Sequence, residues 1–512
     1  MVQAIHSLEH YHSTYLQRFN LNNMKLNNKI IFTILLVALG ASSCKKGWLD
    51  VTSSSEIRAE DQFTSEAGFK DALMGVYIGM TDRQLYASQL TWGALDLISH
   101  QYQAYNTDGA IYYQFQNHNY RGVRSTPQVD AIWNKTYNII ANINNALSYI
   151  DKNKSVLNPI SYSIIKGELL GLRAYLHFDM MRLYGYGNIA NRTDLAGKLA
   201  IPYVKEFNKS ATPQLSYAET FALLLGDINA ASQLLKEDPI FNNPKKPVSY
   251  YTEINRDGFF NKREQRMNYY AVNGLKARVL QWMGGTQNLA IAAIAAEEVI
   301  QYSGRNLAVS TSAASDPRLY PEHLFNLNVV GLIDIVNLYL NGNNVEDQNT
   351  LLILPATAQA LYETSNPNIG LVDIRYNTLL VSENRGMVSI KLRQATNHPT
   401  KNIIPLMKLP EMYYIAAENY INTNLSKAID YLNTVRTARG IIQNIPAAAT
   451  DTQVKDELTK EYRKEYISEG QLFYYYKRLG FATIPGYSVA ATDNIYMLPY
   501  PQAEFEFGQR VQ

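Results

Sequence analysis

Three glutamates in the C-terminal part of the chain have a spacing that could support carboxylate chemistry. Glu461, Glu465 and Glu469 lie four residues apart and would therefore share one face of a helix. Two carboxylates on such a face could serve a glycosidase, but charge pairing at i, i+4 is the commonplace use of this spacing. The cations available for such pairs are Lys460, Arg463, Lys464 and Lys477. We therefore interpret this face as salt-bridged and predict no catalytic residue and no enzymatic activity.

The histidines and the common catalytic motifs give no support to an enzyme. His100, His118, His177, His323 and His398 are not in a metal-ligand spacing such as H-E-x-x-H. The sequence also has no G-x-S-x-G elbow and no P-loop. We predict no metal site and no cofactor, and we interpret His177 as a core histidine. A glycosidase stays open as an alternative, because its two carboxylates can come from anywhere in a chain.

Composition excludes other classes of protein. The 512 residues are 46% apolar and 18% charged, whereas disordered chains are poor in apolar residues and rich in charge. The net charge of +2 gives no basic field for nucleic acid. Tyrosine is unusually common, with 38 Tyr against 16 Phe and 4 Trp. Because its ring is apolar and its tip polar, tyrosine suits half-wet surfaces as well as cores.

The aromatic segment Arg83–Thr126 is the best candidate for a binding site. Flat aromatic rings can pack against the C–H faces of sugars, and binding sites combine such walls with a few placed polar groups. The alternative is that these rings only pack a long loop onto the scaffold. The residues of this loop predicted to contact a ligand are Trp92, Tyr102, Tyr105, Tyr112, Tyr113 and Tyr120. The polar neighbours available for sugar hydroxyls are Asn106, Asp108, Gln114, Asn117 and Asn119.

The N-terminal segment has the parts of an export signal. Lys25 and Lys29 precede an apolar run over Ile30–Ala41, which small residues follow. This run is too short to cross a bilayer, which takes about 20 apolar residues. The only cysteine, Cys44, comes next, as in the lipobox of bacterial lipoproteins, although Ala41 stands where that box usually has Leu. We predict that Cys44 is a lipid anchor; the alternative is an ordinary signal peptide with an incidental cysteine.

These signals divide the chain into three parts. Residues 1–43 are an upstream extension plus the signal peptide, with the true start predicted at Met24, residues 44–60 are a tether, and residues 61–512 form a single α-rich domain. Without residues 1–43 the chain has 44 basic and 44 acidic residues and is formally neutral. We therefore predict an exported, lipid-anchored body.

Amphipathic segments with helical spacing position the aromatic loop. Their pairing predicts a mainly α fold of tetratricopeptide-like helical hairpins with large loop insertions, although no strict period of about 34 residues is present. A minor β hairpin is expected within Thr378–Thr400, and Glu168 and Arg173 are expected to form a structural pair. The expected helices are Ser65–Met80, Ile132–Ile150, Ile164–Tyr184, Tyr217–Leu235, Tyr269–Met283, Leu289–Tyr302, Leu409–Tyr420, Leu425–Arg439 and Asp451–Tyr476.

A set of short motifs runs in order from Cys44 to Gln512. The motifs are Trp48-Leu49-Asp50, Trp133–Asn142, Gly167–Tyr175 with Leu183-Tyr184-Gly185, Ala271–Met283, Leu409–Tyr413 with Ala417-Glu418, Leu432–Arg436, Glu461–Gly480, and Leu498–Pro501 with Glu504. Together they resemble the SusD/RagB family of outer-membrane nutrient-binding lipoproteins. Tyr462, Gln471, Tyr475 and Tyr500 depart from the residues that the family usually has at these positions.

The resemblance implies a SusD-like helical scaffold that caps a SusC-like TonB-dependent transporter and passes a captured oligosaccharide inward. It implies a cell outer-membrane location facing outward. By analogy with the family, Tyr320 joins the predicted ligand-binding residues, and Tyr302 and Phe325 are weaker candidates from the same insertion. RagB-type members handle peptides, so the class of ligand stays open.

Three functions are therefore carried forward. The first is a glycan-binding lipoprotein, with a peptide-binding subunit as its variant. The second is a secreted α-helical glycosidase, and the third is a scaffold that binds only proteins through its helical groove. We favour the first, because the lipobox, the helices and the aromatic loop all agree with it.

Overall fold

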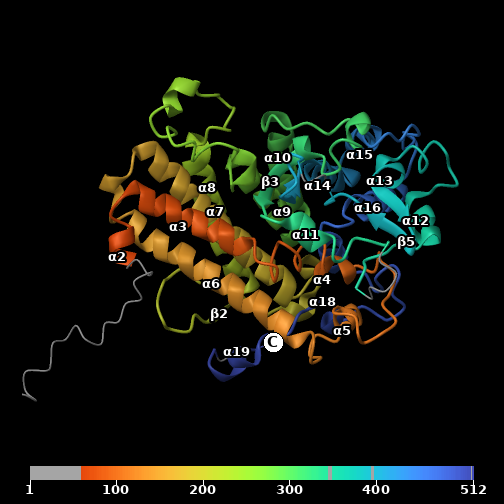
Figure 1. The fold of residues 1–512 in the computed structure, drawn as a ribbon, viewed down its shortest axis with the longest axis horizontal. Helices are drawn as coiled ribbons and strands as arrows, with labels where there is room; N and C mark the ends of the chain where they lie inside the picture. Colours follow the sequence, from red (N-terminus) through yellow and green to blue (C-terminus); the bar gives the residue numbers. More distant parts are fainter. Residues whose placement is uncertain (1–58, 344–348, 394–396, 509, 512) are drawn as a thin grey trace, which may run out of the picture. The chain divides into compact units, whose positions relative to one another are not determined.

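Long helices pack against one another largely in chain order. The computed structural model describes residues 59–343, 349–393, 397–508 and 510–511. Helix α3 packs on α6, α6 on α7, and α7 on α8, and Figure 1 shows these four helices side by side. Helix α8 then contacts α9, α9 packs on α10, and α10 packs on α14, which contacts both α15 and α16. The bounds of these helices are α3 Glu66–Met80, α6 Thr126–Ile150, α7 Pro159–Tyr184, α8 Tyr217–Leu234, α9 Tyr269–Met283, α10 Thr286–Tyr302, α14 Leu409–Ile421, α15 Leu425–Ala438 and α16 Asp451–Glu465.

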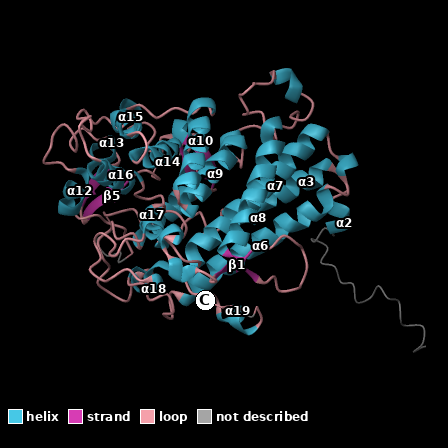
Figure 2. Cartoon of the chain, turned by 180° about the vertical axis from the view of Figure 1, so that it is seen from behind, coloured by secondary structure: helices cyan, strands magenta, loops and turns pink. Residues whose placement is uncertain are grey.

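Short helices and three two-stranded sheets complete the unit that starts at Ala59. Figure 2 shows how little of the chain is strand. The short helices are α2 Ala59–Gln62, α4 Ala94–Leu97, α5 Tyr113–Gln116, α11 Leu332–Val336, α12 Pro355–Tyr362, α13 Ile374–Asn377, α17 Leu472–Leu479, α18 Asp493–Tyr496 and α19 Gln502–Glu506. The antiparallel strand pairs are β1 Leu199–Pro202 with β2 Gln214–Ser216, β3 His323–Asn328 with β6 Ile403–Lys408, and β4 Leu380–Glu383 with β5 Gly386–Ser389. The mainly α fold of paired helices is confirmed, as is the hairpin within Thr378–Thr400.

Local sequence signals start and stop these helices. The Ser65 hydroxyl accepts a hydrogen bond from the Gly68 N–H at the start of α3. Ser216 and Glu219 form a capping box at the start of α8. The Asn268 side chain caps α9, which ends at Gly284, where φ is +67°. Caps of this kind satisfy the backbone N–H groups that the first turn leaves unpaired.

The expected helix over Asp451–Tyr476 is wrong as a single element. Helix α16 ends at Glu465, and α17 begins at Leu472. Between them Ser468 and Gly470 have φ of +66° and +67°, in the left-handed region. The N–H groups of both residues donate to the buried Asp96 carboxylate, at 2.8 and 3.2 Å. A tertiary contact with the aromatic loop therefore breaks the helix, which periodicity alone could not reveal.

The glutamate face of α16 is salt-bridged, but with other partners than the sequence suggested. Glu461 accepts from Arg375 and Arg436, at 2.8 and 3.2 Å. Glu465 accepts from Lys408 and Arg439, at 2.8 and 2.9 Å. The cations come from β6, α13 and the end of α15, because this face points into the protein and not along the helix surface.

Glu469, in the turn after α16, continues the same buried cluster. It accepts from Lys391 and Lys408, at 2.9 and 2.7 Å. Burial raises the pKa of the Glu465 carboxyl, but the charges of Arg439 and Lys408 outweigh it and hold that pKa well below its usual value. The three glutamates are therefore structural groups.

The expected Glu168–Arg173 pair is also wrong. Glu168 accepts from Arg263 and Arg266, at 2.7 and 3.0 Å, whereas Arg173 pairs with Asp227 at 2.7 Å. Residues five apart lie about 140° apart around a helix, since each residue turns it by about 100°. The two side chains of α7 therefore meet different neighbours.

His177 is a core histidine, as predicted. It is fully buried in α7, and its Nδ1 lies 2.9 Å from the Arg173 carbonyl oxygen. Its Nε2 accepts from the Val204 N–H at 2.9 Å, so the ring is neutral. Burial lowers the pKa of His177 to about 3.

We expect Glu465→Gln to lower the free energy of unfolding by about 3–5 kcal/mol, because it leaves buried cations without their carboxylate. Urea denaturation measures this. The matched control is Glu253→Gln, which removes the exposed pair of Glu253 with Arg256 at 3.6 Å. Its effect should stay within about 0.5 kcal/mol. Equal effects of the two changes would contradict a stabilising role for the buried cluster.

We expect Gly470→Ala to destabilise the protein by about 2 kcal/mol or more. Gly470 has φ of +67°, and an added Cβ would lie 2.5 Å from the Thr91 carbonyl oxygen. Gly75→Ala is the control, because Gly75 lies within α3 and an added Cβ there meets nothing within 4 Å. That change should stabilise by about 0.5–1 kcal/mol. Thermal unfolding of both variants gives the comparison, and a tolerated Gly470→Ala would argue against the tight turn.

Candidate ligand-binding site

Four of the predicted loop aromatics are buried: Trp92, Tyr102 and Tyr112 pack within the core, and Tyr120 is 4% exposed. Trp92 is fully buried, donates from Nε1 to the Ala87 carbonyl at 2.9 Å, and packs against Tyr339. Tyr112 also packs against Tyr339 and is 1% exposed. The Tyr102 hydroxyl donates to Asp96 at 2.7 Å. The first three rings offer no surface to a ligand, so packing of the loop, which was the alternative, describes them.

The other predicted aromatics lie nearer the surface. Tyr105, Tyr113 and Tyr320 are half-buried. The Tyr105 hydroxyl donates to the Asn349 carbonyl at 2.8 Å, and the Tyr320 hydroxyl donates to Glu264 at 2.6 Å. Of the weaker candidates, Tyr302 is half-buried and Phe325 is fully buried. The structure does not bring the seven predicted residues together at one place.

Tyr120 is the one predicted residue that lines either of the two large cavities described here. We call the first the Tyr120 cavity; its volume is about 710 Å³. The aromatic loop, the segment after α7 and the C-terminal segment around α18 and α19 all contribute to it. Its lining residues are His118, Asn119, Tyr120, Arg121, Tyr186, Asp493, Asn494, Met497, Pro499 and Phe505.

The chemistry of the Tyr120 cavity suits a polar ligand with flat apolar faces. Tyr186 and Phe505 supply half-buried aromatic rings beside Tyr120, which is 4% exposed, and Asn119 and Asn494 supply amides that can both donate and accept. Asn119 is one of the polar neighbours that the sequence singled out. Tyr186 and the C-terminal residues were missed, and the aromatic Tyr184-Gly185-Tyr186 sequence after α7 was the available signal.

A pair of histidines borders this cavity. His100 and His118 both have left-handed backbone angles, and their Nε2 atoms lie 2.9 Å apart. The Tyr120 hydroxyl donates to the Ile495 carbonyl at 2.8 Å, so it must accept from Nδ1 of His118, 2.7 Å away. Nε2 of His118 is then an acceptor, and His100 donates to it from its own Nε2. Both imidazoles are therefore neutral.

Burial lowers the pKa values of both histidines. The pKa of His100 falls to about 4. The pKa of His118 falls to about 3, because burial and the neighbouring His100 both disfavour a second charge. The His100 ring also stacks on Tyr487 at 4.2 Å. The pair thus fixes one end of the aromatic loop against the C-terminal segment.

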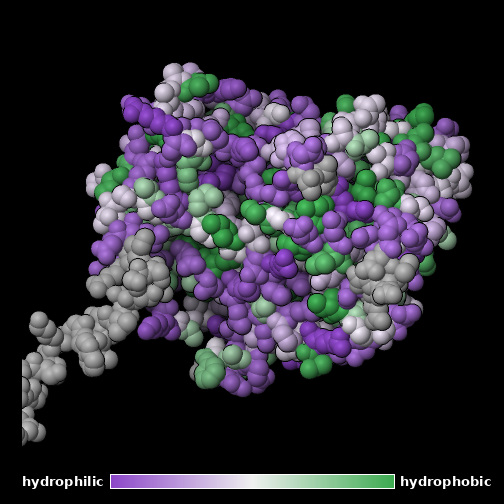
Figure 3. All heavy atoms as spheres, in the orientation of Figure 1, coloured by the Kyte–Doolittle hydropathy of each residue, from purple (hydrophilic) through white to green (hydrophobic). Residues whose placement is uncertain are grey.

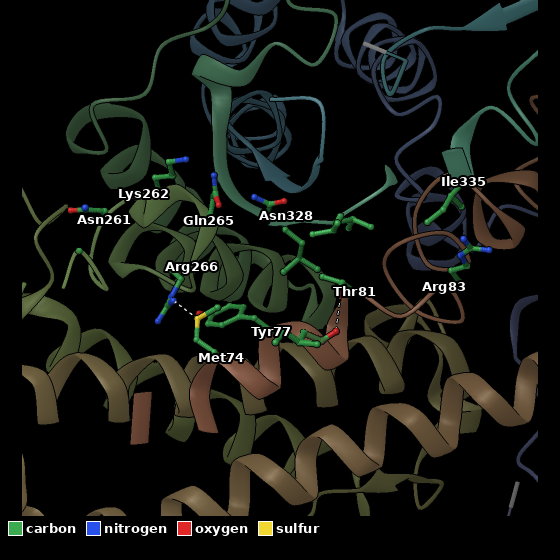
Figure 4. Close-up of a pocket in the computed structure, with 15 residues that line it drawn as sticks. Met74, Tyr77, Thr81, Arg83, Asn261, Lys262, Gln265, Arg266, Asn328 and Ile335 are labelled. Atoms are coloured by element: carbon green, nitrogen blue, oxygen red, sulfur yellow. Dashed lines mark hydrogen bonds between the residues drawn. The ribbon is translucent and has the colours of Figure 1, made fainter. Parts of the chain in front are cut away.

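The second cavity, which we call the α3 groove, has a volume of about 700 Å³. Figure 4 shows α3 with Met74, Tyr77 and Thr81 on one side and Asn261, Lys262, Gln265 and Arg266 on the segment before α9. The remaining lining residues that it labels are Arg83, Asn328 and Ile335.

On the face drawn in Figure 3, hydrophobic residues form small groups among a mostly hydrophilic surface.

The α3 groove is more apolar and more cationic than the Tyr120 cavity. Ile78 and Val330 are 66% and 86% exposed, so the groove presents unusually open aliphatic side chains. Arg83 and Lys262 are exposed cations, and no carboxylate is among the groove's lining residues. Arg266 is structural: its Nε donates to Glu168 at 3.0 Å, and its guanidinium lies over Tyr77 and Phe259.

Neither a metal-binding cluster nor a membrane-spanning helix is found among the described residues. Among them, no three His, Cys, Asp or Glu side chains gather closely enough to hold a metal ion. No helix within the described ranges is long and apolar enough to cross a membrane. Cys44, the predicted signal peptide and the start of the tether lie outside the described residues.

The model of a family described as "Starch-binding associating with outer membrane", SusD-like, matches residues 47–250. This segment includes α3, α6, α7 and α8 and the aromatic loop between the first two. Residues 47–250 are therefore similar to the SusD-like family. None of the curated proteins compared with it matches.

Solved structures of the SusD superfamily share the fold of this chain. A SusD superfamily protein from Bacteroides thetaiotaomicron is 21% identical, with a TM-score of 0.67 over 88% of this chain and 99% of that one. A SusD-like carbohydrate binding protein from Bacteroides vulgatus is 16% identical, with a TM-score of 0.67 over 87% and 97%. Surface glycan-binding protein A from Bacteroides thetaiotaomicron is 15% identical, with a TM-score of 0.63 over 88% and 99%. The predicted SusD/RagB resemblance is thereby confirmed.

We expect the histidine pair to make stability depend on pH. The pKa of each histidine is lower in the folded state than the value of about 6.5 in an unfolded chain. The contribution of the neutral pair is therefore complete above pH 6.5 and is lost as the pH falls toward 4 and then 3. Urea denaturation between pH 7 and pH 4 should show a smaller loss for His118→Gln than for the parent, by on the order of 1–3 kcal/mol.

The control for this comparison is His398→Gln, because His398 lies outside the pair. Buried His177 and His323 are present in every variant, so their contributions cancel. If His118→Gln and the parent lose the same stability over this range, the pair has no such role.

Proposed function

We propose that this SusD-like chain captures an oligosaccharide in the Tyr120 cavity. The observation that carries the proposal is the meeting of three aromatic rings with amide and charged side chains from three separate segments of the chain. Rings can cover the C–H faces of a sugar while Asn119, Asn494 and Arg121 exchange hydrogen bonds with its hydroxyls. The names of the family and of two similar structures, which speak of starch, carbohydrate and glycan, support the same class of ligand.

The proposal is binding without cleavage. A glycosidase ordinarily needs two carboxylates on either side of the scissile bond. Asp493 is the one carboxylate among the described residues that line the Tyr120 cavity. Arg192 already holds it with two hydrogen bonds, at 2.6 and 3.0 Å. A single carboxylate that is already bonded to an arginine supports a binding role over the glycosidase alternative.

The proposed setting is the outer face of the outer membrane. Acylation of Cys44 would anchor the body, and a SusC-like TonB-dependent transporter would receive the captured ligand. The order of signal, lone cysteine and tether in the sequence supports the anchor. The description of the matching family, which names the outer membrane, supports the location.

Peptide binding is the second candidate, and the α3 groove favours it. Exposed Ile78 and Val330 could bury apolar side chains of a peptide, while Arg83 and Lys262 could pair with its carboxylates. The α3 groove offers few aromatic rings to a ligand, since Tyr77 is buried and its hydroxyl donates to Glu168. The two cavities therefore correspond to the two ligand classes that the family resemblance left open.

We expect Tyr186→Ala to weaken oligosaccharide binding by about tenfold, because losing one stacked ring costs roughly 1.4 kcal/mol. Calorimetry of the purified chain against a glycan panel measures this, and product analysis of the same samples tests for cleavage. Tyr250→Ala is the control, since Tyr250 is 41% exposed and lies outside both cavities.

A second variant, Val330→Asp, separates the two candidates. It should leave glycan affinity unchanged and weaken any peptide binding. Unchanged glycan affinity in Tyr186→Ala, with normal circular dichroism, would reject the Tyr120 cavity as the site. Formation of cleaved glycan would establish an enzyme instead.

A further inference from the structure

A small cavity lies inside the helical core, away from both large cavities. It has a volume of about 30 Å³, room for one or two water-sized molecules. Helices α7, α9, α14, α16 and α17 and the turn before α17 surround it. Its lining residues are Arg182, Arg278, Gln281, Trp282, Glu411, Tyr462, Tyr466, Gln471, Tyr474, Tyr475 and Arg478.

Five of these side chains carry a buried polar atom that has no hydrogen-bond partner among the described residues. The atoms are Nε of Arg182, Nη1 of Arg278, Nε1 of Trp282 and the hydroxyls of Tyr466 and Tyr474. All five residues are less than 5% exposed. Buried polar groups in folded proteins are almost always satisfied, so five around one cavity point to a ligand.

The remaining atoms of the two arginines are already used, which fixes what is left for a ligand. Arg278 binds both oxygens of Glu411, through Nε and Nη2 at 2.6 Å each. Arg182 donates to Asp179 and, through Nη1, to Gln471 at 3.2 Å. The Arg182 guanidinium also lies 3.7 Å from the centre of the Tyr474 ring, so these groups adjoin one another.

The unpaired groups are donors, so the ligand that would satisfy them is a negatively charged acceptor. The arginine and indole N–H groups can only donate, and the tyrosine hydroxyls can donate as well. A single water accepts two hydrogen bonds, whereas a halide accepts from all directions. Three arginines and one carboxylate line the cavity, and that carboxylate is bonded at both oxygens, so a cation is disfavoured. The cavity volume of about 30 Å³ suits a single small ion.

We propose that this core cavity is a halide site that binds chloride between α7, α9 and the turn before α17. The ion would join helices from distant parts of the chain by accepting from Arg182, Arg278 and Trp282 at once. The site is independent of the proposed glycan binding, because it shares no residue with the Tyr120 cavity or the α3 groove.

Thermal unfolding of the full chain in sodium chloride and in sodium methanesulfonate, at equal ionic strength, tests the proposal. A ligand that binds only the folded state raises the melting temperature in a saturable way. We expect chloride to do so and methanesulfonate, a larger anion that carries a methyl group, to have no such effect. Equal melting temperatures in the two salts would overturn the proposal.

Two matched variants locate the effect. Tyr474→Phe removes one donor from the cavity and should reduce the response to chloride. Tyr476→Phe removes another buried hydroxyl, but Tyr476 does not line the cavity, so the response should stay as in the parent. Equal responses of the two variants would contradict this site.

Crystals soaked in sodium bromide give the direct measurement. An anomalous peak within hydrogen-bond distance of Arg182 Nε, Arg278 Nη1 and Trp282 Nε1 is expected. Density for water alone at this place, without an anomalous signal, would overturn the proposal.

Discussion

The Glu465 carboxylate is the contact on which the arrangement of the C-terminal half depends. It is 1% exposed and accepts from Arg439 and Lys408, which follow α15 and end β6. Arg439 also binds Glu322, next to β3, so one chain of charges joins both strands of the β3–β6 sheet to α16. Charges taken so far from water are stable only as a complete set, because each loses its hydration on folding. The set therefore specifies one relative placement of these elements.

The position of α16 also determines how the aromatic loop is held. The turn after Glu465 presents Ser468 and Gly470 to Asp96, and Asp96 in turn holds Tyr102. Burial raises the pKa of the Asp96 carboxyl to about 7, although Tyr102 and the two N–H groups oppose the shift. The aromatic loop thus contacts the C-terminal segment through Asp96 and, beside the Tyr120 cavity, through the Tyr120 hydroxyl, which donates to the Ile495 carbonyl, and the His100 ring, which stacks on Tyr487.

Periodicity predicted the long helices well, because their apolar stripes are local features of the sequence. Tyr269–Met283 was predicted with the bounds that α9 has. The break after Glu465 was not predictable, since its cause is Asp96, more than 350 residues away. The predicted ion-pair partners were wrong for the same reason: Glu461 pairs with Arg375 and Arg436 and not with its neighbours along the helix. The binding residues were the least predictable, because a tyrosine such as Tyr112 fits a core as well as it fits a ligand.

The contact between Asp96 and Ser468 also bears on the order in which this protein can acquire its structure. The two residues are 372 positions apart, and the Tyr120 hydroxyl reaches Ile495 across 375. A chain synthesised from its N-terminus presents the aromatic loop long before the residues that hold it. Closure of so large a loop is slow compared with helix pairing between neighbours. The helices α3, α6 and α7 can therefore assemble early, while the Tyr120 cavity is complete only after the final segment has arrived.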